Sequence, residues 1–221
     1  MNALLQFDSY LTLLINGWHT PFLDQFFFVF SRIYVWIPLY LAYIFLFLKN
    51  EGKKGFWIVL SMIILVVISD QISSGLLKPL VERLRPSHDP LLADKLHFVN
   101  GYVGGLYGFV SSHAANTAGL ALFLLLVVRN RWHTFALSTW VLITGYSRVY
   151  LGVHFVGDVV CGALVGVFSA LVSYYGYFYY RNNYLFKNSN SNVILNKNSN
   201  NTLFPVVVYG LTLLVMLLIS V

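Results

Sequence analysis

Long apolar runs, separated by short polar stretches, dominate the chain. An α-helix rises 1.5 Å per residue, so about 20 apolar residues are enough to cross the roughly 30 Å hydrocarbon core of a bilayer. Runs of this length indicate membrane-spanning helices rather than strands. The pattern therefore predicts an all-α polytopic membrane protein, a bundle of six transmembrane helices at about residues 26–48, 55–77, 113–128, 132–146, 153–175 and 203–221.

Two segments outside these runs have patterns of their own. In residues 1–18, apolar positions such as Leu11 and Leu14 accompany Asp8, which predicts an amphipathic helix lying in the membrane interface. The N-terminus has neither a basic region nor a small-residue cleavage site, so we expect no removal of a signal peptide. Residues 187–201 are rich in Asn and Ser and favour a polar cytoplasmic linker.

Composition limits the class of protein. Of the 221 residues, 58% are hydrophobic and only 10% are charged, whereas soluble domains carry roughly 25% charged residues. A net charge of +6 could suit a nucleic-acid partner, but the basic residues flank apolar runs, so membrane topology explains them and we predict no such partner. A single cysteine excludes an intramolecular disulfide and a thiolate metal cluster. We expect one domain spanning 1–221.

The basic residues divide unevenly between the two sides of the predicted bundle. Loops rich in Lys and Arg favour the cytoplasmic side of a membrane. Eight of the 14 basic residues share one side, which we therefore place in the cytoplasm: Lys49, Lys53, Lys54, Arg129, Arg131, Arg181, Lys187 and Lys197. Five others lie in the opposite loops, 78–112 and 147–153, against that bias. Cations gathered on the extracytoplasmic side indicate a binding function.

Three short motifs lie on that extracytoplasmic side. They read KPLVERLRP at 78–86, SSH at 111–113 and SRVYLGVHFVGD at 147–158. The second precedes a predicted span, and the third bridges two spans. Apart from Glu82 and Arg83, which we interpret below as surface charges, they offer three cations, two histidines, one carboxylate and a helix N-terminus.

The cations and the helix N-terminus suit a phosphate group. Lys78, Arg85 and Arg148 supply three positive charges and several N–H donors for a phosphate dianion. Ser111 and Ser112 come just before the third predicted span, where backbone N–H groups and the helix dipole favour an anion. Alternatively, these cations are interfacial anchors whose charged ends reach the membrane surface.

The histidines add a nucleophile and an acid. His154 and Asp158 are four residues apart, so on a helix the carboxylate can hold one ring nitrogen and leave the other free to attack. His113 can then protonate a leaving group. The alternative is a structural pair with a buried polar histidine, which would leave the order and common side of the three motifs unexplained. The set predicts a phosphoryl-transfer site.

In order and spacing, the three motifs resemble the signature of the type-2 phosphatidic-acid phosphatase (PAP2) superfamily, in which Lys-x6-Arg-Pro, Ser-x-His and Ser-Arg-x5-His-x3-Asp recur. The resemblance implies that His154 attacks phosphorus to form a phosphohistidine, that Asp158 orients it, and that His113 protonates the leaving group and then activates water. It further implies that no metal or other cofactor takes part. The implied phosphate-binding residues are Lys78, Arg85, Ser111, Ser112, Ser147 and Arg148.

One position departs from the family pattern. The second motif is usually Pro-Ser-Gly-His, and here Ser112 stands where Gly is usual. A serine adds a Cβ and a hydroxyl where the backbone approaches the phosphate, so the geometry of the phosphate site is expected to differ.

The resemblance implies a lipid phosphatase in the inner membrane, with its active site on the extracytoplasmic side. An outward-facing site favours undecaprenyl diphosphate or a lipid A phosphate as substrate, while phosphatidylglycerol phosphate and phosphatidic acid stay open, as does the oligomeric state. Membrane lipids are the other expected partners. The alternative function is non-catalytic binding or transport of a lipid phosphate, but transport predicts an inverted repeat or paired half-helices, which the sequence does not contain.

The remaining polar residues receive structural interpretations. We expect Asp70, inside the second span, to hydrogen-bond between helices. Arg32 is expected to touch a lipid head group or to pair with Asp24. The other outer-loop side chains are expected to be solvated surface residues: Glu82, Arg83, His88 and His97.

Overall fold

The computed structural model describes residues 3–185 and 201–221, and the regular elements within these ranges are all helical, as predicted. A 3₁₀ turn at Ile33–Trp36 joins α2 to α3, and a π-helical stretch at Gln71–Leu77 joins α4 to α5. The predicted polar linker at 187–201 lies outside the described residues except for its last residue. The α-helices are α1 (Ala3–Asn16), α2 (Pro21–Phe30), α3 (Ile37–Glu51), α4 (Lys53–Asp70), α5 (Lys78–Val81), α6 (Ser112–Val128), α7 (Arg131–Tyr150), α8 (Val156–Tyr180) and α9 (Phe204–Ile219).

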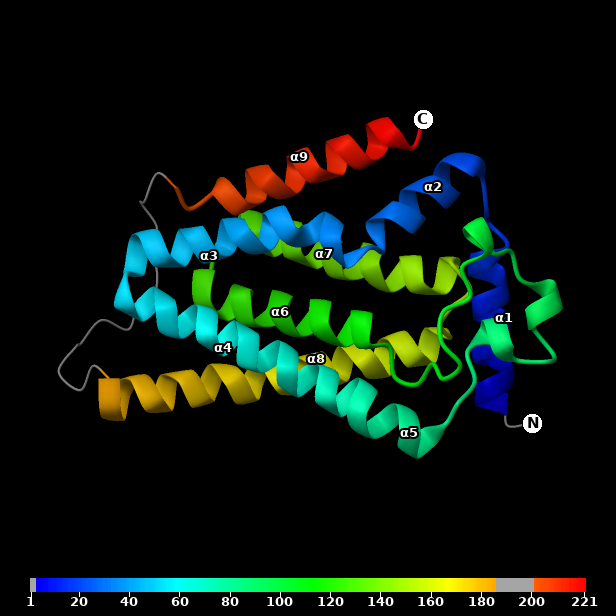
Figure 1. The fold of residues 1–221 in the computed structure, drawn as a ribbon, viewed down its shortest axis with the longest axis horizontal. Helices are drawn as coiled ribbons and strands as arrows, with labels where there is room; N and C mark the ends of the chain where they lie inside the picture. Colours follow the sequence, from blue (N-terminus) through cyan, green and yellow to red (C-terminus); the bar gives the residue numbers. More distant parts are fainter. Residues whose placement is uncertain (1–2, 186–200) are drawn as a thin grey trace.

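Helix α6 is the centre of the bundle (Figure 1), where it packs against α4, α7 and α8. Two glycines of α8 allow the closest of these approaches. A Cβ at Gly162 would lie 2.4 Å from the carbonyl oxygen of Ser111, and one at Gly166 would lie 2.2 Å from that of Ala115. Any larger residue at either position would push α6 and α8 apart. The start of α6 is thereby fixed against the start of α8.

Helix α1 lies crosswise at one end of the bundle, beside the loops that follow α5 (Figure 1). It contacts α7 and α8. Phe155, just before α8, is buried in a small apolar cluster with Leu92 and Leu96 of the long loop, and Leu13 of α1 packs against that cluster. The first helix and the outer loops therefore form one packed cap over the ends of α7 and α8.

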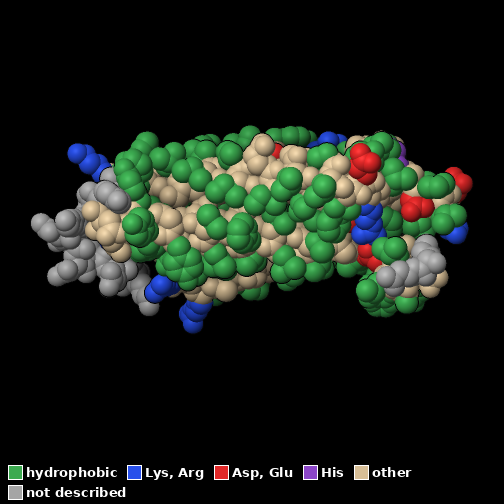
Figure 2. Space-filling view, turned by 90° about the horizontal axis from the view of Figure 1, so that it is seen from below, with side chains coloured by type: hydrophobic (Ala, Val, Ile, Leu, Met, Phe, Trp, Pro, Cys, Tyr) green, Lys and Arg blue, Asp and Glu red, His purple; other side chains and the backbone are tan. Residues whose placement is uncertain are grey.

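The apolar helices identify a membrane protein. Figure 2 shows hydrophobic side chains covering the middle of one face, with most charged side chains gathered towards its two ends. Within the described residues, three helical stretches are long and apolar enough to cross a membrane: Ile33–Glu51, Lys53–Val81 and Val156–Asn183. Shorter apolar helices accompany them at Pro21–Phe30, Ser112–Val128 and Phe204–Ile219. The count of six spans, and the interfacial position of α1, stay predictions.

The first predicted span, 26–48, is wrong as a single helix. Helix α2 ends at Phe30, and Arg32 adopts an extended conformation with φ −80° and ψ 127° before α3 begins. Pro38 lacks an amide hydrogen and therefore suits the first turn of a new helix. The indole of Trp36 donates to the carbonyl oxygen of Phe30 at 2.9 Å, which satisfies a group that the break leaves free.

Two helix ends around the third motif also differ from prediction. Helix α7 continues beyond 146, so Ser147 and Arg148 lie in its last turn rather than in a loop. Gly152, with φ +67°, then turns the chain in a conformation that glycine adopts without strain. His154 consequently lies in the turn before α8, whereas Asp158 lies in the first turn of that helix. The expectation that both share one helical face is wrong, although the two side chains still face each other.

Candidate active site

The last turn of α7 buries a cation. Arg148 is only 2% exposed, and its guanidinium donates to the hydroxyls of Ser31 and Tyr102, the latter at 3.1 Å. Its Nε has no hydrogen-bond partner among the described residues. The adjacent Ser147 is also buried, and its hydroxyl donates to the carbonyl oxygen of Thr144 in the same helix at 2.7 Å. Arg148 thus has spare donor capacity for an anion, whereas the hydroxyl of Ser147 is bound to its own helix.

The imidazole of His154 is buried between a carboxylate and a cation. Its Nδ1 lies 3.5 Å from Oδ2 of Asp158, and its Nε2 lies 3.0 Å from a guanidinium nitrogen of Arg85. Arginine nitrogens only donate hydrogen bonds, so we assign the free lone pair to Nε2 and the proton to Nδ1. Burial, and then the charges of Arg85 and Arg148, lower the pKa of His154 well below its ordinary value. The ring is therefore neutral at pH 7, and the lone pair of Nε2 accepts a hydrogen bond from Arg85.

Asp158 is held rigidly at the start of α8. Its side chain is fully buried, and Oδ2 accepts from the backbone N–H of Phe155 at 3.1 Å. Oδ1 accepts from Arg83 at 2.8 Å. Its backbone carbonyl accepts from the N–H of Ser111 at 2.9 Å, which joins the start of α8 to the start of α6.

The first motif provides two further cations. Nζ of Lys78 donates to the hydroxyls of Ser74 at 3.1 Å and Ser112 at 3.2 Å. Lys78 thus bridges the π-helical stretch before α5 to the first residue of α6.

Arg85 is tied to the two loops that surround the imidazole. It donates to the carbonyl oxygens of Tyr107 at 3.1 Å and Val153 at 2.9 Å. Burial, and then the charge of Arg148, lower the pKa of Arg85. The two guanidinium groups therefore repel each other, and a bound anion would relieve that repulsion.

The second motif begins α6 as predicted. Ser111 is the N-cap, and its side chain accepts from the N–H of Ala114 at 3.4 Å. Ser112 is the first helical residue, so its backbone N–H belongs to the positive end of the helix dipole. The ring of His113 is hydrogen-bonded to the backbone of Ser31.

The structure brings the three motifs together at the capped end of the bundle. The charges and rings that act on His154 are those of Arg85, Arg148, His113 and Lys78. Ser111 and Ser112 join this group through Asp158 and Lys78. The predicted nucleophile, carboxylate, acid and cations therefore converge, although Ser147 contributes through its position beside Arg148 rather than through a free hydroxyl.

An apolar cavity of about 450 Å³ adjoins this group. Ser112 and His113 line one part of it, together with Asp70. The remaining walls are mainly apolar and come from the 3₁₀ turn, α3, α4 and α6; they include Trp36, Tyr40, Met62, Ile63, Val67 and Leu120. The cavity therefore runs from polar side chains, among them Ser112, which accepts from Lys78, into a hydrophobic interior.

Sequence reasoning missed several residues of the site. Arg83 was expected on the surface, but it is about one-fifth exposed and pairs with Asp8 and Asp158 at 2.8 Å each, so that expectation is wrong. Tyr102 and Ser31 hold Arg148 from a loop and a helix end that no motif marks. The only sequence signal for Arg83 was its place among the cations on the side where positive residues are disfavoured.

Asp70 and Arg32 take positions that their sequence contexts left open. Asp70 accepts from Ser74 at 3.2 Å, one turn along the same helical stretch, so the expected bond between helices is wrong. Because Ser74 also accepts from Lys78, the hydroxyl of Ser74 connects Asp70 to a cation of the candidate site.

Arg32 lies over the rings of Phe28 and Tyr102, with 4.2 and 5.3 Å between its Cζ and the ring centroids.

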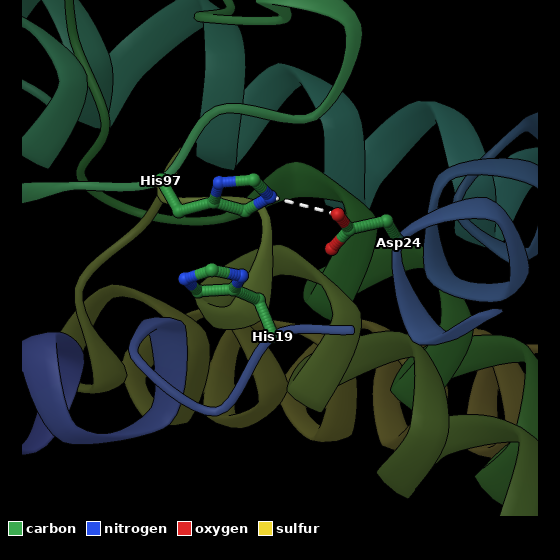
Figure 3. A group of neighbouring side chains, drawn as sticks. All are labelled: His19, Asp24 and His97. Atoms are coloured by element: carbon green, nitrogen blue, oxygen red, sulfur yellow. Dashed lines mark hydrogen bonds and ion pairs between the residues drawn. The ribbon is translucent and has the colours of Figure 1, made fainter. Parts of the chain in front are cut away.

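A second polar cluster lies at the junction of α1, α2 and the outer loop (Figure 3). Nε2 of His97 pairs with Oδ2 of Asp24 at 2.8 Å, and the ring of His19 stacks on His97 with 3.9 Å between centroids. His97 was expected to be solvated, and this pairing corrects that expectation. The ligand-type atoms of these three side chains lie within 4.8 Å of one another. Both Asp24 oxygens are already occupied, since Tyr150 donates to Oδ1 at 2.6 Å, so hydrogen bonds that anchor the outer loop account for the cluster.

The chain is similar to several known proteins in sequence and in fold. The family model of the PAP2 superfamily matches residues 54–182. The lipid A 4'-phosphatase of Bacteroides thetaiotaomicron is 39% identical, over 76% of this chain and 76% of that protein. The enzyme of the same name from Porphyromonas gingivalis is also 39% identical, over 84% of this chain and 79% of its own length. The crystal structure of LpxE from Aquifex aeolicus superposes with a TM-score of 0.59 at 28% identity, covering 74% of this chain and 92% of that one.

Proposed function

The chain belongs to the PAP2 superfamily of membrane phosphatases, and we propose that it removes the 4'-phosphate of lipid A through a phosphohistidine formed on His154. One observation carries the catalytic part of the proposal. His154 is a buried, neutral imidazole with a carboxylate near one nitrogen and Arg85 at the other, and the charges of Arg148 and Lys78 also act on the ring. The lipid A part rests on the similarity to two lipid A 4'-phosphatases over three quarters or more of this chain.

In the proposed first step, Nε2 of His154 attacks phosphorus. Arg85 donates to Nε2 in the substrate-free site, and a phosphate oxygen would accept that donor instead and leave the lone pair free. The Nε2–P bond forms as the bond from phosphorus to the lipid oxygen breaks, and His113, which takes up a proton when the phosphate dianion binds beside it, gives that proton to the departing oxygen. Asp158 stabilises the positive charge that develops on the ring.

In the second step, water attacks phosphorus and the P–N bond breaks. His113, now neutral, accepts the proton of that water, and inorganic phosphate leaves. Throughout, the oxygens of the phosphoryl group are held by Lys78, Arg85, Arg148 and the first backbone N–H groups of α6. Each of these donors lies at the same end of the bundle, and no metal is needed to neutralise the charge.

The apolar cavity supports a lipid as the substrate. Its polar part holds Ser112 and His113, and its walls run along α3, α4 and α6 between apolar side chains. We place the phosphate beside His154 and at least one acyl chain in this cavity. The excess of basic residues at the opposite end of the bundle supports an inner-membrane protein whose site opens on the extracytoplasmic side.

A panel of lipid phosphates tests the proposal. Purified protein in detergent with EDTA is expected to release phosphate from lipid A with a kcat/KM at least about tenfold above that for the other lipids, since a matched pocket contributes 1–3 kcal/mol. The panel contains undecaprenyl diphosphate, phosphatidylglycerol phosphate and phosphatidic acid, and fragment masses of the lipid product identify the position that loses phosphate. A preference for another lipid would refute the substrate, and release that stops with EDTA would refute the metal-free mechanism.

A bulky residue in the cavity is expected to act on lipids selectively. Ile63 lines the cavity from α4 and is half-exposed, so Ile63→Trp can fill space without displacing the buried core. We expect this change to raise KM for lipid A roughly tenfold because the acyl chain loses its contacts, while kcat/KM for water-soluble p-nitrophenyl phosphate stays within twofold. Steady-state kinetics on both substrates measure this. Phe56→Trp, on the exposed surface of the same helix and outside the cavity, is the matched control; equal effects on both substrates would contradict the assignment.

A further inference from the structure

A chain of charged side chains connects α1 to the carboxylate of the proposed catalytic pair. The guanidinium of Arg83 contacts Oδ1 of Asp158 with one nitrogen and Oδ2 of Asp8 with the other, each at 2.8 Å. The second oxygen of Asp8 accepts from the backbone N–H of Gly157 at 2.8 Å. Asp8 thus contacts both the guanidinium and the first turn of α8, where Asp158 lies.

The surrounding backbone is built to leave room for these carboxylates. A Cβ at Gly157 would lie 2.8 Å from Oδ2 of Asp8, and one at Gly108 would lie 2.9 Å from Oδ2 of Asp158. The carbonyl oxygen of Arg83 accepts from the N–H of Gly108 at 2.8 Å, which fixes the backbone of Arg83. Both carboxylates that bind Arg83 therefore pack directly against a glycine, Asp8 against Gly157 and Asp158 against Gly108.

The guanidinium of Arg83 also packs against an aromatic ring. Its Cζ lies 3.9 Å from the centroid of the Phe155 ring. Phe155 follows His154 directly, and its N–H donates to Oδ2 of Asp158. Arg83 therefore packs on the same short turn that carries the nucleophile, which restricts the movement of both partners of the pair.

A fully buried carboxylate needs such a partner. Asp158 has an exposed side-chain fraction of 0%, and an unpaired buried charge is costly enough that the group either takes up a proton or moves. Arg83 keeps Oδ1 occupied, and the N–H of Phe155 donates to Oδ2, which leaves Oδ2 3.5 Å from Nδ1 of His154. Groups that orient the ligands of a metal site without touching the metal change activity by roughly 10–100-fold when removed, and we take that range as the expected scale here.

We propose that Arg83, held by Asp8 of α1, is a positioning residue for the His154–Asp158 pair, so that the N-terminal helix completes the active site. The inference rests on the proposed function of that pair. Asp8 lies far outside residues 54–182, the part of the chain that the family model matches. The outer helix of this protein is therefore expected to matter for catalysis as well as for membrane attachment.

The first test is steady-state kinetics of Arg83→Met and Asp8→Asn in the full chain, with lipid A as the substrate. A positioning role predicts that Arg83→Met lowers kcat about 30-fold to 100-fold while KM stays within about threefold, because the phosphate contacts are untouched. Asp8→Asn is expected to lower kcat less, by about tenfold, since Arg83 keeps its other partner. Arg83→Lys restores part of the loss by retaining one charged donor. Glu82→Gln, at the exposed neighbouring position, is expected to leave kcat unchanged and serves as the control.

A double-mutant cycle separates positioning from general stabilisation. If Arg83 acts through Asp158, Arg83→Met is expected to change the residual rate by less than about twofold when it is added to Asp158→Asn. Circular dichroism and size-exclusion chromatography confirm that each variant is folded, and Arg83→Lys and Asp8→Asn provide the same comparison should Arg83→Met not fold.

Two outcomes would overturn the inference. One is a wild-type kcat in the Arg83→Met variant. The other is that Arg83→Met lowers kcat by the same factor in the wild-type protein and in the Asp158→Asn variant. Neither outcome touches the proposed function, which is tested separately by the lipid panel with EDTA and by His154→Ala.

Discussion

Replacement of His154 by alanine is expected to lower phosphate release from lipid A by at least about 10⁴-fold, because the substitution removes the proposed nucleophile and leaves only binding and electrostatic effects. The ring of His154 is buried, and its pKa is lowered by burial and by two neighbouring guanidinium groups. A neutral ring contributes no charge to the phosphate clamp, so nucleophilic attack is the role that its removal would abolish.

The measurement is a rapid-quench experiment with ³²P-labelled substrate. Wild-type protein is expected to form a phosphoenzyme that is labile in acid and stable in base, as a phosphorus–nitrogen bond is, and His154→Ala to form none. His88→Ala is the matched control, because this histidine also lies in the outer loop and its ring bonds only to the neighbouring Ser87 among the described residues; it is expected to retain wild-type activity. A His154→Ala variant within tenfold of wild type would eliminate the phosphohistidine mechanism.

The helical class and the site motifs could be read from the sequence because both depend on local regularities. Bilayer thickness fixes the length of an apolar run, and this relation indicated the helices that became α3, α4 and α8. The site motifs keep a fixed order and spacing because they occupy helix ends that face one another. The hydrogen bonds from Lys78 to the hydroxyl of Ser112, and from the N–H of Ser111 to the carbonyl oxygen of Asp158, join the three motifs in the structure.

Contacts between distant segments could not be predicted in the same way. Arg83 is separated by 75 positions from each of its partners, Asp8 and Asp158. Nothing in its local sequence distinguishes it from a surface charge, because its environment arises only when α1 docks across the end of the bundle. The same holds for Tyr102 and Ser31, which meet Arg148 through tertiary packing.

The direction in which a side chain points also could not be predicted from the sequence. Ser147 follows the family pattern, yet its hydroxyl donates to Thr144 once α7 extends past the predicted end. Hydroxyls inside helices commonly bond to the carbonyl three or four residues earlier, and only the true helix boundary shows that this serine does so. The break at Arg32 was missed for a related reason, since apolar residues continue on both sides of it.

The second large effect is expected for Arg148. Arg148→Lys should lower kcat/KM about 10²-fold to 10³-fold, the loss that follows when one preorganised donor to a developing negative charge is removed. Lysine keeps the positive charge but not the planar fork of donors, and its ammonium cannot reach the hydroxyls of Ser31 and Tyr102 while it also contacts a phosphate. Steady-state kinetics on lipid A measure the loss. Arg131→Lys, exposed at the other end of the same helix, is the control and is expected to leave kcat/KM unchanged.

A second substitution of Arg148 is expected to abolish activity without lowering the thermal stability of the protein. In the substrate-free site Arg148 is buried beside other cations, its Nε is unpaired among the described residues, and its charge lowers the pKa of Arg85. Arg148→Met removes this repulsion and fills a similar volume, so its melting temperature in detergent should be at least that of wild type while activity disappears. Inorganic phosphate is expected to raise the melting temperature of wild type, by binding only the folded state, but not that of Arg148→Met. If phosphate raises the melting temperature of both proteins equally, Arg148 does not bind the anion. If the melting temperature of Arg148→Met is much lower than that of wild type, the hydrogen bonds from Arg148 to Ser31 and Tyr102 stabilise the fold more than repulsion between the cations destabilises it.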